Sequence, residues 1–217
     1  MIFPRLDSHQ EEQESQATNH LMGYGWWSWI IPLKNGEVSA GLTYDSELFT
    51  PPDGNTQTER LQKHLLAHPI GKEMFGKAVP VEKDTRSYSG LAYYSSKPAD
   101  DGWISVGDAA GFIDPLYSQG LDYCAHSVSF AAKIIVKEQG GACVKADIAD
   151  YAQQFVTSYL RWYHALYQGK YRYLGDAELM NAAFWLDIGT YFIGPVRLVH
   201  DDPVTEFPRF PYYGTAG

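Results

Sequence analysis

The strongest constraint on the fold is a run in which a short apolar strand ends at a Gly-Asp pair and a long helix follows after a loop. The run reads WISVGDAAGFIDPLYSQGLDYCAHSVSFAAKII. Residues 103–106 predict a strand that ends abruptly at Gly107 and Asp108. From Leu121 to Glu138 apolar residues recur at helical spacing, and a Gly-Gly pair closes the helix. This order predicts a carboxylate at a sheet edge, beside the start of a helix.

Such an arrangement suits a bulky ligand. The Asp108 carboxylate can accept a hydrogen bond from a ribityl or ribose hydroxyl, and the small residues 109–111 let a ligand approach the backbone. Pro115 stiffens the loop. A helix that begins near Gly120 presents free N–H groups and a dipole worth ~1 kcal/mol to a developing negative charge. For Gly-Asp-Ala-Ala alone, an ordinary strand-to-helix turn explains the residues equally well.

Composition bounds the class of protein. A chain of 217 residues, 45% of them apolar, can bury a core and form one domain or one and a half. A net charge of −9 argues against a nucleic-acid partner. No apolar run of about 18 residues predicts a membrane span, and the polar start lacks the apolar segment of a signal peptide, so we expect a cytoplasmic protein. Cys124 and Cys143 lack metal-type spacing, and no metal is predicted.

The remaining elements follow from local patterns. Residues 26–32, WWSWIIP, and 37–45 predict a β-hairpin with Asn35-Gly36 at its turn. Thr56 or Thr58 caps a helix that should stop near His68-Pro69. Residues 86–96 read as extended. Residues 146–168 predict an aromatic helix, and 177–188 a third one, before a proline-rich tail.

The fifteen residues GDAAGFIDPLYSQGL resemble the second FAD-binding motif of the flavin hydroxylase, flavin halogenase and geranylgeranyl reductase superfamily. The resemblance implies FAD as cofactor, with Asp108 as the ribityl ligand and the backbone N–H groups of Gly120 and Leu121 at the isoalloxazine. The cofactor-binding residues expected on this basis are Gly107, Asp108, Ala110, Pro115, Gln119, Gly120 and Leu121.

A second motif narrows the resemblance. Trp27-Ser28-Trp29-Ile30-Ile31-Pro32 matches the W-x-W-x-I-P pattern of flavin-dependent halogenases. In that family the two tryptophans are thought to keep the organic substrate away from the flavin, so Trp27 and Trp29 are the expected catalytic residues. The alternative is a buried aromatic strand without a chemical role.

The sequence departs from the pattern of the flavin-dependent halogenases at three points. Tryptophan halogenases carry a Glu where Tyr117 stands, which points towards phenols or carrier-bound pyrroles as substrates. Gln119 replaces a small residue beside the expected halide site, which leaves halide binding open. The chain has no G-x-G-x-x-G turn for the pyrophosphate, and no lysine matches the catalytic lysine of the family. A fragment, a split gene product or a truncated reading frame is the simplest explanation.

Weaker signals have structural explanations. His126 lies one helical turn after Asp122, but a structural histidine is the favoured interpretation. Asp201-Asp202 and Glu11-Glu12 lack partners at metal-ligand spacing. A cluster of tyrosines either lines a substrate cavity or simply packs a helix, and packing is the favoured interpretation. Its members are Tyr163, Tyr167, Tyr171 and Tyr173.

We therefore expect an α+β chain with a partial FAD-dependent hydroxylase-type fold: an antiparallel substrate-side sheet, one Gly-Asp strand-helix unit and a helical C-terminus. The expected regions are a polar segment (1–19), the substrate-side region (20–100), part of an FAD-binding domain (101–140) and a helical region (141–217).

The favoured function is halogenation of an electron-rich aromatic, free or carrier-bound. A halide and a flavin reductase that supplies reduced FAD are the other implied partners, besides a separate N-terminal chain. The alternatives are a monooxygenase, a geranylgeranyl-type reductase, and an inactive fragment or complementing half of a split flavoprotein.

Overall fold

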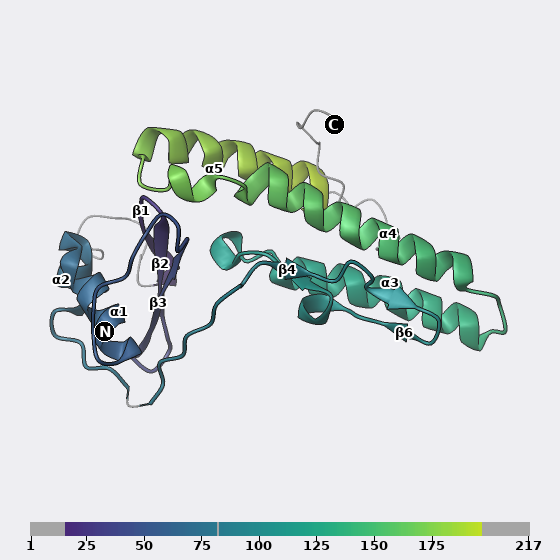
Figure 1. The fold of residues 1–217 in the computed structure, drawn as a ribbon, viewed down its shortest axis with the longest axis horizontal. Coiled ribbons are helices and arrows are strands. Elements are labelled where there is room, and N and C mark those ends of the chain that lie inside the picture. Colours follow the sequence, from purple (N-terminus) through teal and green to yellow (C-terminus); the bar gives the residue numbers. More distant parts are fainter. Residues whose placement is uncertain (1–15, 82, 197–217) are drawn as a thin grey trace. The chain divides into compact units, whose positions relative to one another are not determined.

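The computed structural model describes residues 16–81 and 83–196, which form two compact units. Unit 1 takes its described residues from the first 87 positions and from 169–181, and unit 2 from 88–168 and from 182 onwards. Both combine helices with small antiparallel sheets, as expected for an α+β chain (Figure 1). The first fifteen residues of the polar segment expected over 1–19, and the proline-rich tail from residue 197 onwards, lie outside the described residues.

Unit 1 is built on a three-stranded antiparallel sheet in the order β1-β2-β3. The strands are β1 (Asn19–Gly23), β2 (Trp26–Pro32) and β3 (Val38–Tyr44). The predicted hairpin is confirmed as β2 and β3, with Trp29 opposite Gly41 and with Gly36 at a φ of 82° in the turn. That left-handed conformation explains the glycine at this position.

Two helices complete unit 1. Helix α1 (Gln57–Ala67) begins at Thr56, whose side chain accepts a hydrogen bond from the Glu59 N–H as predicted for a cap. Helix α2 (Pro69–Phe75) follows directly, because Pro69 ends α1 and suits the first position of the next helix. A small core of Leu21, Ile30 and Met74 links β1, β2 and α2.

Unit 2 is organised by the long helices α3 (Gly120–Gln139) and α4 (Lys145–Trp162), which lie alongside each other in Figure 1. Aromatic residues fill the space between them: the ring centroid of Tyr123 lies 5.4 Å from that of Trp162, and that of Phe130 lies 5.4 Å from that of Tyr151. The predicted aromatic helix is thereby confirmed, and its aromatic side chains form much of the core of unit 2.

Short elements surround this helix pair. Strand β4 (Tyr93–Tyr94) pairs with β7 (Gly111–Phe112), and β5 (Ala99–Asp100) pairs with β6 (Trp103–Ile104). The single-turn helices of unit 2 are η2 (Gly107–Ala109), η3 (Pro115–Tyr117), η4 (Tyr163–Tyr167) and η6 (Phe192–Val196), whereas η5 (Lys170–Arg172) belongs to unit 1. Helix α5 (Ala177–Tyr191) is the predicted third helix.

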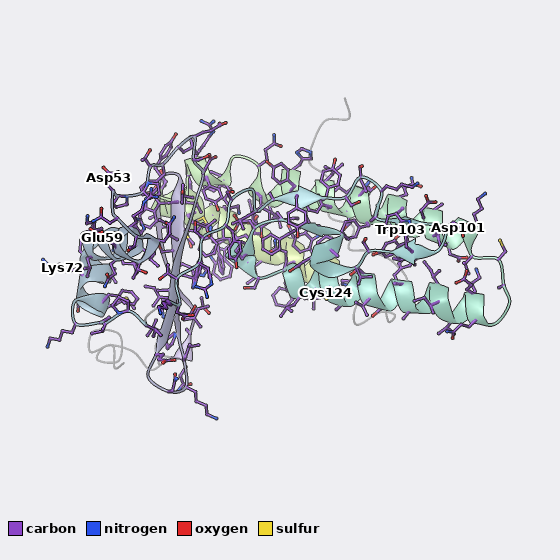
Figure 2. The ribbon with its side chains drawn as sticks, turned by 60° about the horizontal axis from the view of Figure 1, so that its bottom comes forward. Asp53, Glu59, Lys72, Asp101, Trp103 and Cys124 are labelled. Atoms are coloured by element: carbon purple, nitrogen blue, oxygen red, sulfur yellow. The ribbon has the colours of Figure 1, made fainter. Side chains whose placement is uncertain are left out.

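Two local predictions need correction. The strand expected over 103–106 is paired only at β6, where Trp103 is half exposed beside the turn that carries Asp101 (Figure 2). The apolar residues whose spacing predicted α3 lie largely on its exposed side, with Leu121 at 81% exposure. The buried side of α3 instead carries bulky and polar residues, among them Tyr123 and His126. Among the described residues no helix is both long enough and apolar enough to cross a membrane.

Candidate functional site

The Gly-Asp segment turns sharply at Gly107. This residue has a φ of 53°, and its N–H donates a 2.8 Å hydrogen bond to the Ser127 hydroxyl of α3. A Cβ at Gly107 would lie 3.2 Å from the sulfur of Cys124, which Figure 2 labels on the same helix. The left-handed backbone conformation therefore favours glycine here, and the Cys124 sulfur leaves little room for a Cβ.

Asp108 follows in η2 with its side chain exposed, while its backbone oxygen accepts a 2.7 Å hydrogen bond from the Tyr93 hydroxyl. The backbone is thus tied down and the carboxylate reaches solvent. An exposed carboxylate can accept a hydrogen bond from a ligand hydroxyl.

The small residues after Asp108 serve the protein interior. Ala110 is fully buried, and its carbonyl accepts a hydrogen bond from the Ser95 N–H at 2.7 Å. A Cβ at Gly111 would lie 3.1 Å from the Tyr93 carbonyl and 3.3 Å from the Tyr159 ring. The small size of Ala110 and Gly111 is therefore explained by close packing within unit 2, which was not the reason the sequence suggested.

Two tyrosines of α4 hold the segment at both ends. The Tyr151 hydroxyl donates to the Ser105 carbonyl at 2.6 Å, and the Tyr159 hydroxyl donates to the Phe112 carbonyl at 2.9 Å. Burial raises the pKa of both phenols, that of Tyr159 to about 12, so both remain protonated donors at neutral pH. Sequence reasoning missed these contacts, since helical spacing of aromatics indicates only which side is buried.

The loop before α3 is braced by its own polar groups. Asp114 Oδ1 accepts from the Leu116 N–H at 2.9 Å where Pro115 starts η3. The Gln119 side chain is buried; its Nε2 donates to the Asp114 carbonyl at 2.8 Å, and its Oε1 accepts from the Tyr167 hydroxyl at 2.7 Å. The amide group of Gln119 is therefore engaged within the protein, and a contact with a cofactor would have to use its backbone.

The N-terminus of α3 lacks a side-chain cap. Gln119 precedes the helix, and a Cβ added at Gly120 would meet no atom within 4 Å. The first N–H groups of a helix have no partner within the helix, so those of Gly120 and Leu121 can donate to a ligand. Tyr117, which stands in the same loop, donates a 2.7 Å hydrogen bond to the Asp187 carboxylate of α5, a contact that no sequence pattern indicated.

The tryptophan pair lies in unit 1, on β2. Trp27 is buried and Trp29 is half buried, and their ring centroids are 5.9 Å apart. Trp27 Nε1 donates to the Tyr171 hydroxyl at 3.0 Å, and Trp29 Nε1 donates to the Ser39 hydroxyl at 3.3 Å. Because side chains alternate along a strand, both rings share one face of the sheet.

Between the tryptophans, Ser28 points to the opposite face, where its hydroxyl lies 3.1 Å from Nε2 of His64 on α1. Both residues are buried. Burial, helped by the nearby His68, lowers the pKa of His64 to about 4, so the imidazole is neutral at physiological pH. Three consecutive residues of β2 are therefore each fixed by a side-chain hydrogen bond.

The structure gathers all seven expected cofactor residues into one segment of unit 2, whereas Trp27 and Trp29 belong to unit 1. His126 is buried and its pKa is lowered by burial, which agrees with a structural histidine. Among the residues with described positions, no group of side chains has a metal-binding arrangement.

Comparison with known proteins identifies the family. The profile of the tryptophan halogenase family matches residues 7–188. Tryptophan 2-halogenase of Chondromyces crocatus is 31% identical over 153 residues, which are 70% of this chain and 29% of that protein. Tetracycline 7-halogenase of Kitasatospora aureofaciens is 24% identical over 195 residues, 86% of this chain and 34% of that protein. The crystal structure of halogenase PltM superimposes with a TM-score of 0.77 at 20% identity over 93% of this chain and 42% of that one, a likeness of fold.

The chain belongs to the tryptophan halogenase family, and the resemblance to flavin-dependent halogenases is thereby confirmed. It spans about a third or less of the length of these two curated relatives.

Proposed function

We propose that this chain supplies the ribityl and isoalloxazine side of the FAD site of a flavin-dependent halogenase that acts on an electron-rich aromatic. The observation that carries the proposal is the exposed Asp108 on a fixed backbone, in the same segment as the uncapped N-terminus of α3. Family membership supports FAD as the cofactor, since one PltM structure is a complex with phloroglucinol and FAD.

The residues present fit this half of the cofactor. Asp108 would accept a hydrogen bond from a ribityl hydroxyl, and the N–H groups of Gly120 and Leu121 would face the pyrimidine edge of the isoalloxazine. The positive end of the α3 dipole favours negative charge at that edge. When bound, FAD supplies the redox chemistry of the reaction. The remaining roles of Gly107, Ala110, Pro115 and Gln119 are to shape and hold the backbone of this cradle.

Trp27 and Trp29 support halogenation in particular. By the family resemblance they would keep an aromatic substrate away from the cofactor, and within unit 1 each indole N–H is held by a hydroxyl group. Tyr117 in place of a carboxylate favours a phenol or a carrier-bound pyrrole over tryptophan. The co-reactants under this proposal are a halide, oxygen and reduced FAD from a flavin reductase, in the cytoplasm. A G-x-G-x-x-G turn for the pyrophosphate and a catalytic lysine would have to come from residues outside this sequence.

One observation favours a second candidate, an FAD-dependent monooxygenase. Gln119 fills the place of a small residue beside the expected halide site, and its buried amide is held by Asp114 and Tyr167. A site closed in this way would favour oxygen transfer without a halide. Product analysis of the completed enzyme with bromide present separates the two: a brominated aromatic supports halogenation, and a hydroxylated one supports the monooxygenase.

The cofactor assignment can be tested on this chain directly. FAD is titrated into the ¹⁵N-labelled protein, and backbone amide shifts are followed. We expect the largest changes at Asp108, Gly120 and Leu121. Changes confined to other segments, or none at millimolar FAD, would contradict the assignment.

A further inference from the structure

Two tyrosines only four positions apart each bond to a residue of a different motif. The Tyr167 hydroxyl donates to Gln119 Oε1 at 2.7 Å in unit 2, and the Tyr171 hydroxyl accepts from Trp27 Nε1 at 3.0 Å in unit 1. We propose that these are positioning residues: Tyr167 fixes the loop that leads into α3, and Tyr171 fixes the first tryptophan of the pair. The inference rests on the proposed function for its biological meaning, but the two hydrogen bonds can be tested without a cofactor.

Tyr167 acts through a chain of two hydrogen bonds, of which the first is buried and the second is partly buried. Its hydroxyl holds Gln119, and the Gln119 amide in turn holds the Asp114 carbonyl at 2.8 Å, so one phenol braces both ends of the loop. Tyr167 and Gln119 are 5% and 4% exposed, so water cannot easily replace either partner. Burial raises the pKa of Tyr167 well above its usual value, which keeps the phenol protonated as a donor.

A widened helical turn directs Tyr167 into this position. After α4, the Gln168 N–H bonds to the Tyr163 carbonyl at 2.8 Å, five residues back, in the π-type turn η4. Such a turn adds one residue to the usual α-helical spacing and rotates the side chains after it. A regular α-helical turn would send residue 167 in a different direction.

Tyr171 holds β2 and the residue just before it. Its carbonyl accepts from the Gly25 N–H at 2.8 Å, and its hydroxyl accepts from the Trp27 indole two residues further on. An indole N–H can only donate, and Trp27 is 2% exposed, so Tyr171 is the acceptor that satisfies it. Because Trp29 packs against Trp27, the bond also limits how far the second ring can turn.

The first arm of the test uses Tyr171→Phe with ¹⁵N-labelled tryptophan. The chain has six tryptophans, so six indole N–H signals are expected. Loss of the acceptor should move the Trp27 indole signal upfield, and should move that of Trp29, whose ring packs against Trp27, by less. The matched control, Ser39→Ala, should do the reverse. A Trp27 signal that does not move in Tyr171→Phe, or that moves equally in Ser39→Ala, would overturn the role of Tyr171.

The second arm uses Tyr167→Phe and amide hydrogen exchange. The Ser118 N–H, bonded to the Pro115 carbonyl at 3.0 Å, reports on the loop. Leaving the buried Gln119 oxygen unsatisfied should speed its exchange about 5- to 100-fold, while amides in the middle of α4 keep their rates. Unchanged exchange at Ser118, or equal acceleration throughout α4, would overturn the role of Tyr167.

A wild-type measurement covers the case in which a variant fails to fold. The Trp27 indole N–H should have a small temperature coefficient and slow solvent exchange, unlike the exposed indole of Trp185. Fast exchange at Trp27 would contradict the Tyr171 bond. Because none of these readouts involves flavin, a failure of FAD binding with both arms positive would remove the proposed function alone.

Discussion

Acidification from pH 7 to pH 5 should destabilise the protein through His64, the imidazole bonded to Ser28 between the two tryptophans. In the folded chain burial lowers the pKa of this group to about 4, against 6.5 for an exposed histidine. Between these values the unfolded chain takes up a proton that the folded chain does not. Above pH 6.5 His64 therefore has no effect on how the free energy of unfolding depends on pH. Between pH 6.5 and pH 4 that free energy falls as the pH falls, and below pH 4 His64 causes no further loss.

The magnitude follows from the same two values. At pH 5 the unfolded histidine is about 1.5 pH units below its pKa, which at 1.36 kcal/mol per unit gives a loss of about 2 kcal/mol. Urea denaturation followed by tryptophan fluorescence at pH 7 and pH 5 measures it. His64→Gln keeps a neutral hydrogen-bonding side chain but cannot titrate, so the loss on acidification should be about 2 kcal/mol smaller in the variant. Equal losses in the two proteins would refute the assignment of a neutral, buried His64.

Three further substitutions test the packing around the site, each by chemical denaturation. Gly107→Ala places a Cβ at a φ of 53° and should cost about 1–2 kcal/mol, whereas Gly120→Ala, which meets open space, should cost nothing; equal effects would show that Gly107 is unstrained. Gly41→Ala would overlap the Trp29 ring and should cost about 1–3 kcal/mol with a shift of the Trp29 indole signal, and a neutral result would contradict that contact. Phe155→Ala in the fully buried core of unit 2 should cost about 3–5 kcal/mol, and a loss below 1 kcal/mol would contradict its central position.

Local chemistry made several elements predictable. The Thr56 cap, the Pro69 stop and the Asn35-Gly36 turn act within a few residues, and each determined a helix end or a hairpin without help from the rest of the chain. The order of Gly107, Asp108 and the helix start was predictable for the same reason.

Long-range contacts were not predictable. The bonds from Tyr151 to Ser105 and from Trp27 to Tyr171 join residues 46 and 144 positions apart. Periodicity also misled at α3, where the apolar spacing through Leu121 marks a largely exposed side. A helical pattern shows that one face differs from the other, but only the packed structure shows which face its neighbours cover.

The most direct test of the central claim compares three flavins that differ in what they carry. Lumiflavin has only the isoalloxazine ring, riboflavin adds the ribityl chain, and FAD adds the pyrophosphate and adenosine. Binding of each to this chain is measured by NMR titration of the wild type, of Asp108→Ala and of Asp101→Ala, an exposed carboxylate at the β5–β6 turn that serves as the control (Figure 2).

We predict that riboflavin binds about 10- to 100-fold more tightly than lumiflavin to the wild type and to Asp101→Ala, the range expected of a hydrogen bond to a carboxylate. Asp108→Ala should abolish that advantage, and FAD should gain little over riboflavin. A riboflavin advantage that survives Asp108→Ala, or equal binding of lumiflavin and riboflavin to the wild type, would contradict the ribityl assignment on which the account depends.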